Sequence, residues 1–167
     1  MHKLAITLAV SMTLGLAAAA GASLPVAGAF AGKTSLKPIN GFVDIVTFNS
    51  AKKGTVLTKF VFGTLGCFGT SSFPVGTDPY GEAENTATVK GSIPVTKKGT
   101  FLITTKPTLA DPEGVVTTAV IQGSVVNSKS IAGTITVSQS DKGDTCGPSK
   151  MKFTAMPGTP SSLGIGP

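Results

Sequence analysis

The side chains of this sequence that could do chemistry are almost all lysines and carboxylates. The single histidine is His2, tryptophan and arginine are absent, and Tyr80 is the one tyrosine. A Ser-His-Asp triad, a Cys-His pair and a histidine-ligated metal therefore have no histidine to use beyond the N-terminal segment. A two-carboxylate glycosidase would need a cleft, usually with aromatic platforms, and this sequence is poor in aromatic residues. We expect no enzymatic activity and no cofactor.

Lysine pairs occur twice in the same four-residue sequence. Lys52-Lys53-Gly54-Thr55 recurs as Lys97-Lys98-Gly99-Thr100, and Asn127-Ser128-Lys129 is a third short polar segment. Lysines present point charges, so they favour weak and salt-sensitive contacts with a polyanion such as a wall polymer, an acidic polysaccharide or a lipid surface. Nucleic acid is not expected, because no segment combines aromatic and basic residues as a single-strand platform does. The candidate polyanion-binding residues are Lys52, Lys53, Lys97, Lys98 and Lys129.

Carboxylates gather in an acidic segment at residues 78–85 and again before the second cysteine. Calcium takes six to eight oxygen ligands, and carboxylates can supply them. No EF-hand spacing is present, so a solvated acidic loop is the alternative interpretation. The weak calcium candidates are Asp78, Glu82, Glu84, Asp141 and Asp144.

The two cysteines are Cys67 and Cys146. An exported chain meets an oxidising compartment, so the pair is expected to form a disulfide. The alternatives are a redox pair or a metal site, but the spacing is not C-x-x-C and no histidine lies nearby.

The N-terminal residues 1–31 have the pattern of a secretory signal peptide. His2 and Lys3 form a short positive start, and no charged residue follows until after Ala31. Small residues at Ala29 and Ala31 predict cleavage before Gly32, and cleavage after Ala29 is the second choice. The alternative is an uncleaved membrane anchor, because the apolar run is nearly long enough to span a bilayer. We expect a secreted or surface-exposed protein that contacts a membrane only if the signal stays attached.

Short runs of β-branched and aromatic residues fill the rest of the chain, separated by Gly, Pro and Asn. Several runs alternate between apolar and polar residues, which indicates one buried face per strand. Pro94 indicates an edge position or a bulge. The seven expected strands are Gly41–Asn49, Thr55–Gly63, Thr86–Val95, Thr100–Lys106, Val116–Val126, Ser130–Ser138 and Ser149–Met156. We expect an all-β fold, an antiparallel β-sandwich that is Ig-like or barrel-like, with about seven strands and one disulfide.

Strand parity adds a prediction about charge. If consecutive strands run in opposite directions, the three lysine-bearing turns lie at one end of the domain. Most carboxylates and both cysteines then lie at the other end, which is what a Cys67–Cys146 disulfide requires. The alternative is that the loops carry charge only because they face water.

The domain expected from residues 32–156 has a family resemblance. Phe60-Val61-Phe62-Gly63 runs on to Cys67, and Gly133-Thr134-Ile135 precedes Cys146-Gly147 and Lys152-Phe153-Thr154-Ala155. This pattern resembles uncharacterised small bacterial exported proteins built from a signal peptide and one single-disulfide β-sandwich domain. The resemblance implies a fold and a location but no site. Residues 157–167 lack apolar mass and are expected to be a disordered tail.

The functional expectation is therefore an exported, non-enzymatic binding domain that contacts an anionic cell-surface polymer through a Lys-rich end. Two alternatives remain open. One is a structural or protein-interaction module that pairs through a sheet edge. The other is a small carrier that holds an apolar ligand between its sheets.

Overall fold

The computed structural model describes residues 24–35, 45–65, 84–109, 116–141 and 144–165, which form ten strands and two short 3-10 helices. Neither helix in this part of the chain is long and apolar enough to cross a membrane. The strands are β1 (Gly28–Thr34), β2 (Ile45–Ala51), β3 (Val56–Leu65), β4 (Glu84–Thr88), β5 (Ser92–Pro94), β6 (Thr100–Thr105), β7 (Thr108–Leu109), β8 (Val116–Asn127), β9 (Ser130–Asp141) and β10 (Asp144–Pro157), and the helices are η1 (Lys52–Gly54) and η2 (Ser161–Leu163).

All the strands belong to one antiparallel sheet with the order β6-β8-β9-β10-β1-β2-β3-β4-β7, and β5 also pairs with β3. The all-β, antiparallel prediction is confirmed. The prediction of about seven strands is wrong, because three further strands occur. β1 begins within residues 1–31, which were assigned to the signal peptide, and ends within the expected domain. β7 is an additional short strand, and the expected strand Thr86–Val95 is divided into β4 and β5.

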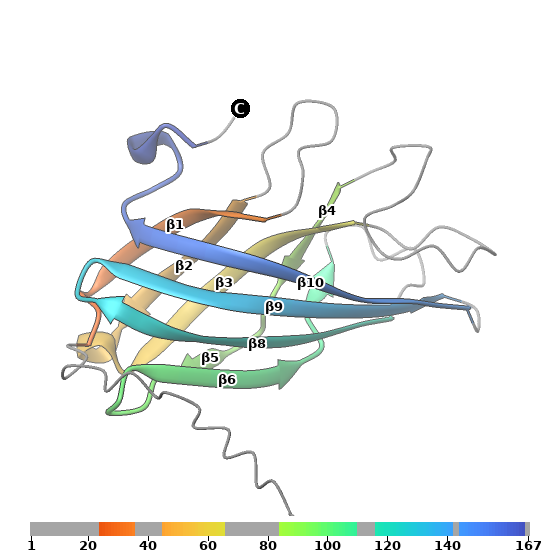
Figure 1. Ribbon diagram of the computed structural model, residues 1–167, viewed down its shortest axis with the longest axis horizontal. Helices are drawn as coiled ribbons and strands as arrows, with labels where there is room; N and C mark the ends of the chain where they lie inside the picture. Colours follow the sequence, from red (N-terminus) through yellow and green to blue (C-terminus); the bar gives the residue numbers. More distant parts are fainter. Residues whose placement is uncertain (1–23, 36–44, 66–83, 110–115, 142–143, 166–167) are drawn as a thin grey trace, which may run out of the picture.

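The sheet curls into a half-barrel rather than forming two separate sheets (Figure 1). A flat sheet with nine strands in its path would be about 38 Å wide. Its two outermost strands, β6 and β7, are consecutive in the chain and are joined only through Lys106 and Pro107. Three Cα–Cα steps reach at most about 11 Å, so the two edges must approach each other. The short link therefore requires the curl.

Strand β1 lies at the centre of the sheet, between β10 and β2. Its Phe30 is 1% exposed and pairs with Phe48 of β2. A Cβ at Gly32 would lie 1.9 Å from the carbonyl oxygen of Thr154, so only glycine fits this close approach to β10. Both cleavage sites expected from the sequence fall inside this strand. Cutting before Gly32 would remove the buried Phe30 and Ala31, and cutting before Phe30 would remove Leu24, which packs against the core.

The β3 strand bends at Lys59, which has a φ of 51°. The register with β2 shifts here, and the strand opposite is interrupted between β4 and β5, where Gly91 has a φ of 89°. A left-handed residue in a bulge bends its strand, so this is one place where the sheet turns. Pro94 follows in β5, which has β3 as its only ladder partner among the described strands, so the expected edge position is confirmed.

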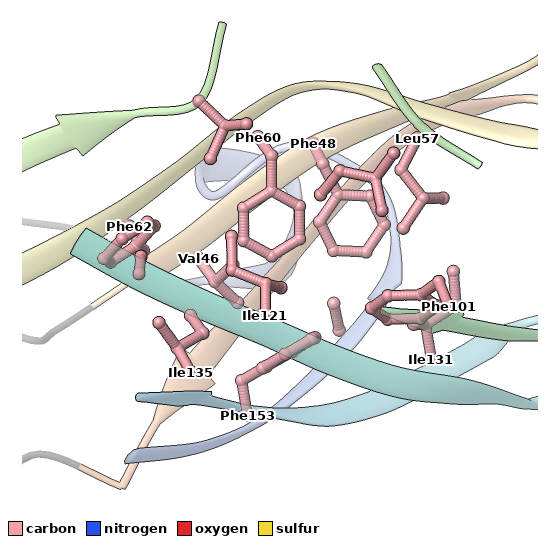
Figure 2. Close-up of a cluster of buried hydrophobic side chains, with 14 of the residues drawn as sticks. Val46, Phe48, Leu57, Phe60, Phe62, Phe101, Ile121, Ile131, Ile135 and Phe153 are labelled. Atoms are coloured by element: carbon pink, nitrogen blue, oxygen red, sulfur yellow. The ribbon is translucent and has the colours of Figure 1, made fainter. Parts of the chain in front are cut away.

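Aromatic rings fill the inside of the curl (Figure 2). Phe48 stacks on Phe30 at a centroid distance of 5.4 Å and on Phe60 at 5.1 Å. Phe153 of β10 meets Phe48 and Phe60 edge-on at 6.5 and 5.8 Å. Such pairs contribute about 0.5–1.5 kcal/mol each beyond the burial of their area. These ring contacts therefore join β1, β2, β3 and β10 inside the curl.

The C-terminal residues differ from the expected disordered tail. The N–H of Gly158 donates to the carbonyl of Ala29, and η2 follows. The hydroxyl of Ser162 accepts from the N–H of Thr159 at 2.8 Å, and the N–H of Ile165 donates to Pro160 at 2.9 Å. Residues 158–165 thus form a compact, hydrogen-bonded turn next to β1.

Candidate functional site

The three lysine-bearing turns meet at one end of the half-barrel. The N–H of Val95, just before the β5–β6 turn, donates to the carbonyl of Thr55 in the β2–β3 turn at 2.8 Å. The N–H of Val125, close to the β8–β9 turn, donates to Gly99 of the β5–β6 turn, also at 2.8 Å. The structure therefore brings Lys52, Lys53, Lys97, Lys98 and Lys129 together, and all five are exposed. We call this group the lysine-rich end.

The β2–β3 turn holds two lysines in a backbone conformation that glycine would adopt more easily. Lys52 and Lys53 have φ values of 48° and 57°, and Gly54 has 84°. Left-handed backbone costs an L-residue about 1–2 kcal/mol. Thr55 supports the turn, because its hydroxyl and its N–H both donate to the carbonyl of Lys52, at 2.9 and 3.3 Å. Lys52 and Lys53 therefore occupy positions where a lysine makes the fold less stable than a glycine would.

The β5–β6 turn uses the same four residue types with a different backbone. Here only Gly99 has a positive φ, 74°, and its N–H donates to the carbonyl of Thr96 at 2.8 Å. Gly99 thus takes the left-handed conformation that closes a tight turn between β5 and β6, two strands that pair with β3 and β8 rather than with each other. The hydroxyls of Thr96 and Thr100 also bond each other at 2.8 Å. Lys97 and Lys98 thus project from a turn that these hydrogen bonds stabilise.

The β8–β9 turn is the shortest of the three. Asn127 pairs with Ser130 across it, and the Asn127 side-chain oxygen accepts from the N–H of Lys129 at 2.8 Å. This bond is an Asx-turn, in which the asparagine side chain takes the place of a backbone carbonyl. It fixes the backbone that carries Lys129.

The sequence interpretation missed the contribution of the N-terminal segment to this end. The N–H of Val26 donates to the carbonyl of Ser128 at 3.1 Å. A Cβ at Gly54 would lie 2.6 Å from the carbonyl oxygen of Pro25 and 2.9 Å from Cβ of Leu24. Leu24 and Pro25 therefore lie directly against the β2–β3 turn. Nothing in the local sequence distinguished these residues from the end of a signal peptide.

The five lysines of the lysine-rich end are among the eleven of the fourteen lysines whose side chains are described. At 0.1 M ionic strength charges act over about 10 Å, so neighbouring turns present their lysines to a ligand jointly.

The calcium and disulfide predictions remain predictions. Asp78, Glu82 and Cys67 lie outside the described residues, and the side chains of Glu84, Asp141, Asp144 and Cys146 are not described. Their backbone positions are at the ends of β4, β9 and β10, and Asp141 pairs with Asp144. The 12-residue β9 separates that pair from the β8–β9 turn by about 36 Å. In the described part of the chain, no group of three or more His, Cys, Asp or Glu side chains could hold a metal.

A shallow groove lies on the sheet, and none of the five lysines of the lysine-rich end is among its lining residues. It crosses β6, β8, β9 and β10 over the backbone of Gly123 and Gly133. Its lining offers an exposed Leu102, an amide, hydroxyls and one lysine, but no carboxylate. The polar lining residues are Gln122, Ser124, Thr134, Lys152 and Thr154.

No family model, curated protein or solved structure matches this chain. Function must therefore be argued from the site itself.

The sequence interpretation also did not predict that the side chains of Gln139 and Ser50 are buried. The Gln139 side chain is 1% exposed, and its amide nitrogen donates to the hydroxyl of Thr117 at 3.3 Å. Among the residues that the structure describes, the amide oxygen of Gln139 and the hydroxyl of Ser50 have no hydrogen-bond partner. Buried groups without partners lower stability, so these positions weaken the core and contribute nothing to the lysine-rich end.

Proposed function

We propose that this protein is an exported, non-enzymatic domain that binds an anionic surface polymer through its lysine-rich end. The observation that carries the proposal is the convergence of three braced turns, which present five exposed lysines at one end. Ammonium groups clustered in this way attract a polyanion and release its counterions when they bind.

The backbone strain of the β2–β3 turn supports the same proposal. Glycine or asparagine at Lys52 or Lys53 would fit φ values of 48° and 57° more easily. Conformations that cost stability gather at functional positions, where another requirement outweighs the cost. A requirement for positive charge at these two positions would account for the lysines.

The two alternatives receive unequal support from the described structure. An apolar carrier would need internal space, but the inside of the curl is packed with the rings of Phe30, Phe48, Phe60 and Phe153. Edge pairing has one observation in its favour. β6 pairs only with β8 among the described strands, and its Leu102 is 63% exposed. A second chain could add to that edge, which would make the protein dimeric.

The test is retention of the exported chain on cell-wall material and on an acidic polysaccharide across a salt series. The test variant changes Lys52, Lys53, Lys97 and Lys98 to Gln. The matched control has the same change in net charge but alters four exposed lysines outside the three turns: Lys33, Lys90, Lys106 and Lys150.

Three results are informative. Loss of retention in the test variant, with retention kept by the control, supports binding at the lysine-rich end. Equal loss in both variants would mean that net charge alone acts, without a site. No retention at low salt would reject the polymer, and a concentration-dependent dimer in the same preparation would favour pairing through the β6 edge.

A further inference from the structure

The fold restricts where an export signal could be removed. Cleavage before Gly32 would delete Phe30, which is 1% exposed and stacks on Phe48. It would also remove four of the six residue pairs that join β1 to β2 and two of the five that join β1 to β10. Cleavage before Phe30 would cut the same strand two residues earlier.

Residues before β1 belong to the fold as well. Leu24 packs against the hydrophobic core, and Pro25 is buried. Val26 is bonded to Ser128, and the β2–β3 turn closes on Leu24 and Pro25 at Gly54. A folded product must therefore retain the chain from Leu24 onward.

We infer that the signal is removed by hydrolysis of the peptide bond between Ala22 and Ser23. Ala20-Gly21-Ala22 places small residues at the two positions that a signal peptidase reads, directly after the apolar run. Water supplies the oxygen in this peptidase-catalysed step. Ala22 becomes the carboxylate end of the released signal, and Ser23 gains the free α-ammonium group of the product.

This position links processing to the proposed function, on which the following point rests. The new amino terminus is one residue before Leu24, and Leu24 lies against Gly54 in the β2–β3 turn. Cleavage therefore leaves a free ammonium group one residue from Leu24, whereas the unprocessed chain has residues 1–22 attached at this point.

The test uses the intact mass of the full chain after expression in a host that exports it. The expected product comprises residues 23–167. A product that begins at Phe30, at Gly32 or at any other residue, or a chain that is not cleaved, would overturn the assignment. This mass does not depend on polymer binding, so the inference and the proposed function can fail separately.

Two matched variants sharpen the test. Ala29→Gln alters the last position of one site expected from the sequence and the third-to-last position of the other, and Ala29 is exposed in β1. We expect Ala29→Gln to be processed like the native chain and Ala22→Gln to keep its signal. The reverse pattern would place cleavage inside β1 and refute the inference.

A contribution of the new amino terminus to binding has its own readout. Acetylation of the Ser23 amino group in the processed chain removes one positive charge. The slope of log affinity against log salt should therefore become less steep by about 0.7–0.9, the value for one charge. An unchanged slope would show that the amino terminus takes no part in binding.

Discussion

Replacement of Phe30 by alanine tests whether β1 belongs to the folded protein. Phe30 is 1% exposed, and its ring stacks on Phe48 at 5.4 Å with an interplanar angle of 7°. Truncation of a buried phenylalanine to alanine costs about 3–5 kcal/mol. The whole free energy of unfolding of a domain is about 5–15 kcal/mol. For a chain of this size we expect the melting temperature to fall by about 10–20 °C.

The assay is urea unfolding of the exported product followed by far-ultraviolet circular dichroism, because the chain has no tryptophan to report by fluorescence. Leu102→Ala is the control, since Leu102 is 63% exposed and should cost no more than about 0.5 kcal/mol. If Phe30→Ala lowers the free energy of unfolding no more than this control does, β1 is not part of the core, and the restriction on signal cleavage fails with it.

Three further predictions follow from the backbone and the buried polar groups. Lys53→Gly should raise the free energy of unfolding by about 0.5–1 kcal/mol and weaken polymer binding, whereas Lys98→Gly should weaken binding without that gain in urea titrations. Gly133→Ala should destabilise by more than about 2 kcal/mol, because its Cβ would lie 2.3 Å from a carbonyl oxygen of β8; a normal melting temperature would contradict the close approach. Replacing Gln139 by Met together with Thr117 by Val should leave the melting temperature unchanged or raise it. A large fall in the melting temperature would show that these two side chains make a further hydrogen bond that stabilises the fold.

The sequence predicted the regular parts of the fold well. Alternation of apolar and polar residues located most strands, and Lys-Lys-Gly-Thr correctly predicted two tight turns. Strand parity placed Lys53 and Lys98 at the same end, which the bonds between Thr55 and Val95 and between Gly99 and Val125 require. Parity succeeds because it depends only on the number of reversals between two turns.

The N-terminal strand could not be recognised from its composition. Gly28–Thr34 has the small, apolar residues that also surround a signal peptidase site, so the local sequence supports either interpretation. In the structure these residues form the central strand β1, which depends on pairing with β10, more than a hundred residues away. The bend at Lys59 could not be predicted either, because lysine is not a residue type that indicates a left-handed backbone conformation.

The proposal of a polyanion site at the lysine-rich end is tested most directly by the salt dependence of affinity for an acidic polysaccharide. For a polymer with closely spaced charges, each lysine contact contributes about 0.7–0.9 to the slope of log affinity against log salt, so changing Lys52, Lys53, Lys97 and Lys98 to Gln should make that slope less steep by about 3. Equal slopes for the native chain and this variant would contradict the proposal.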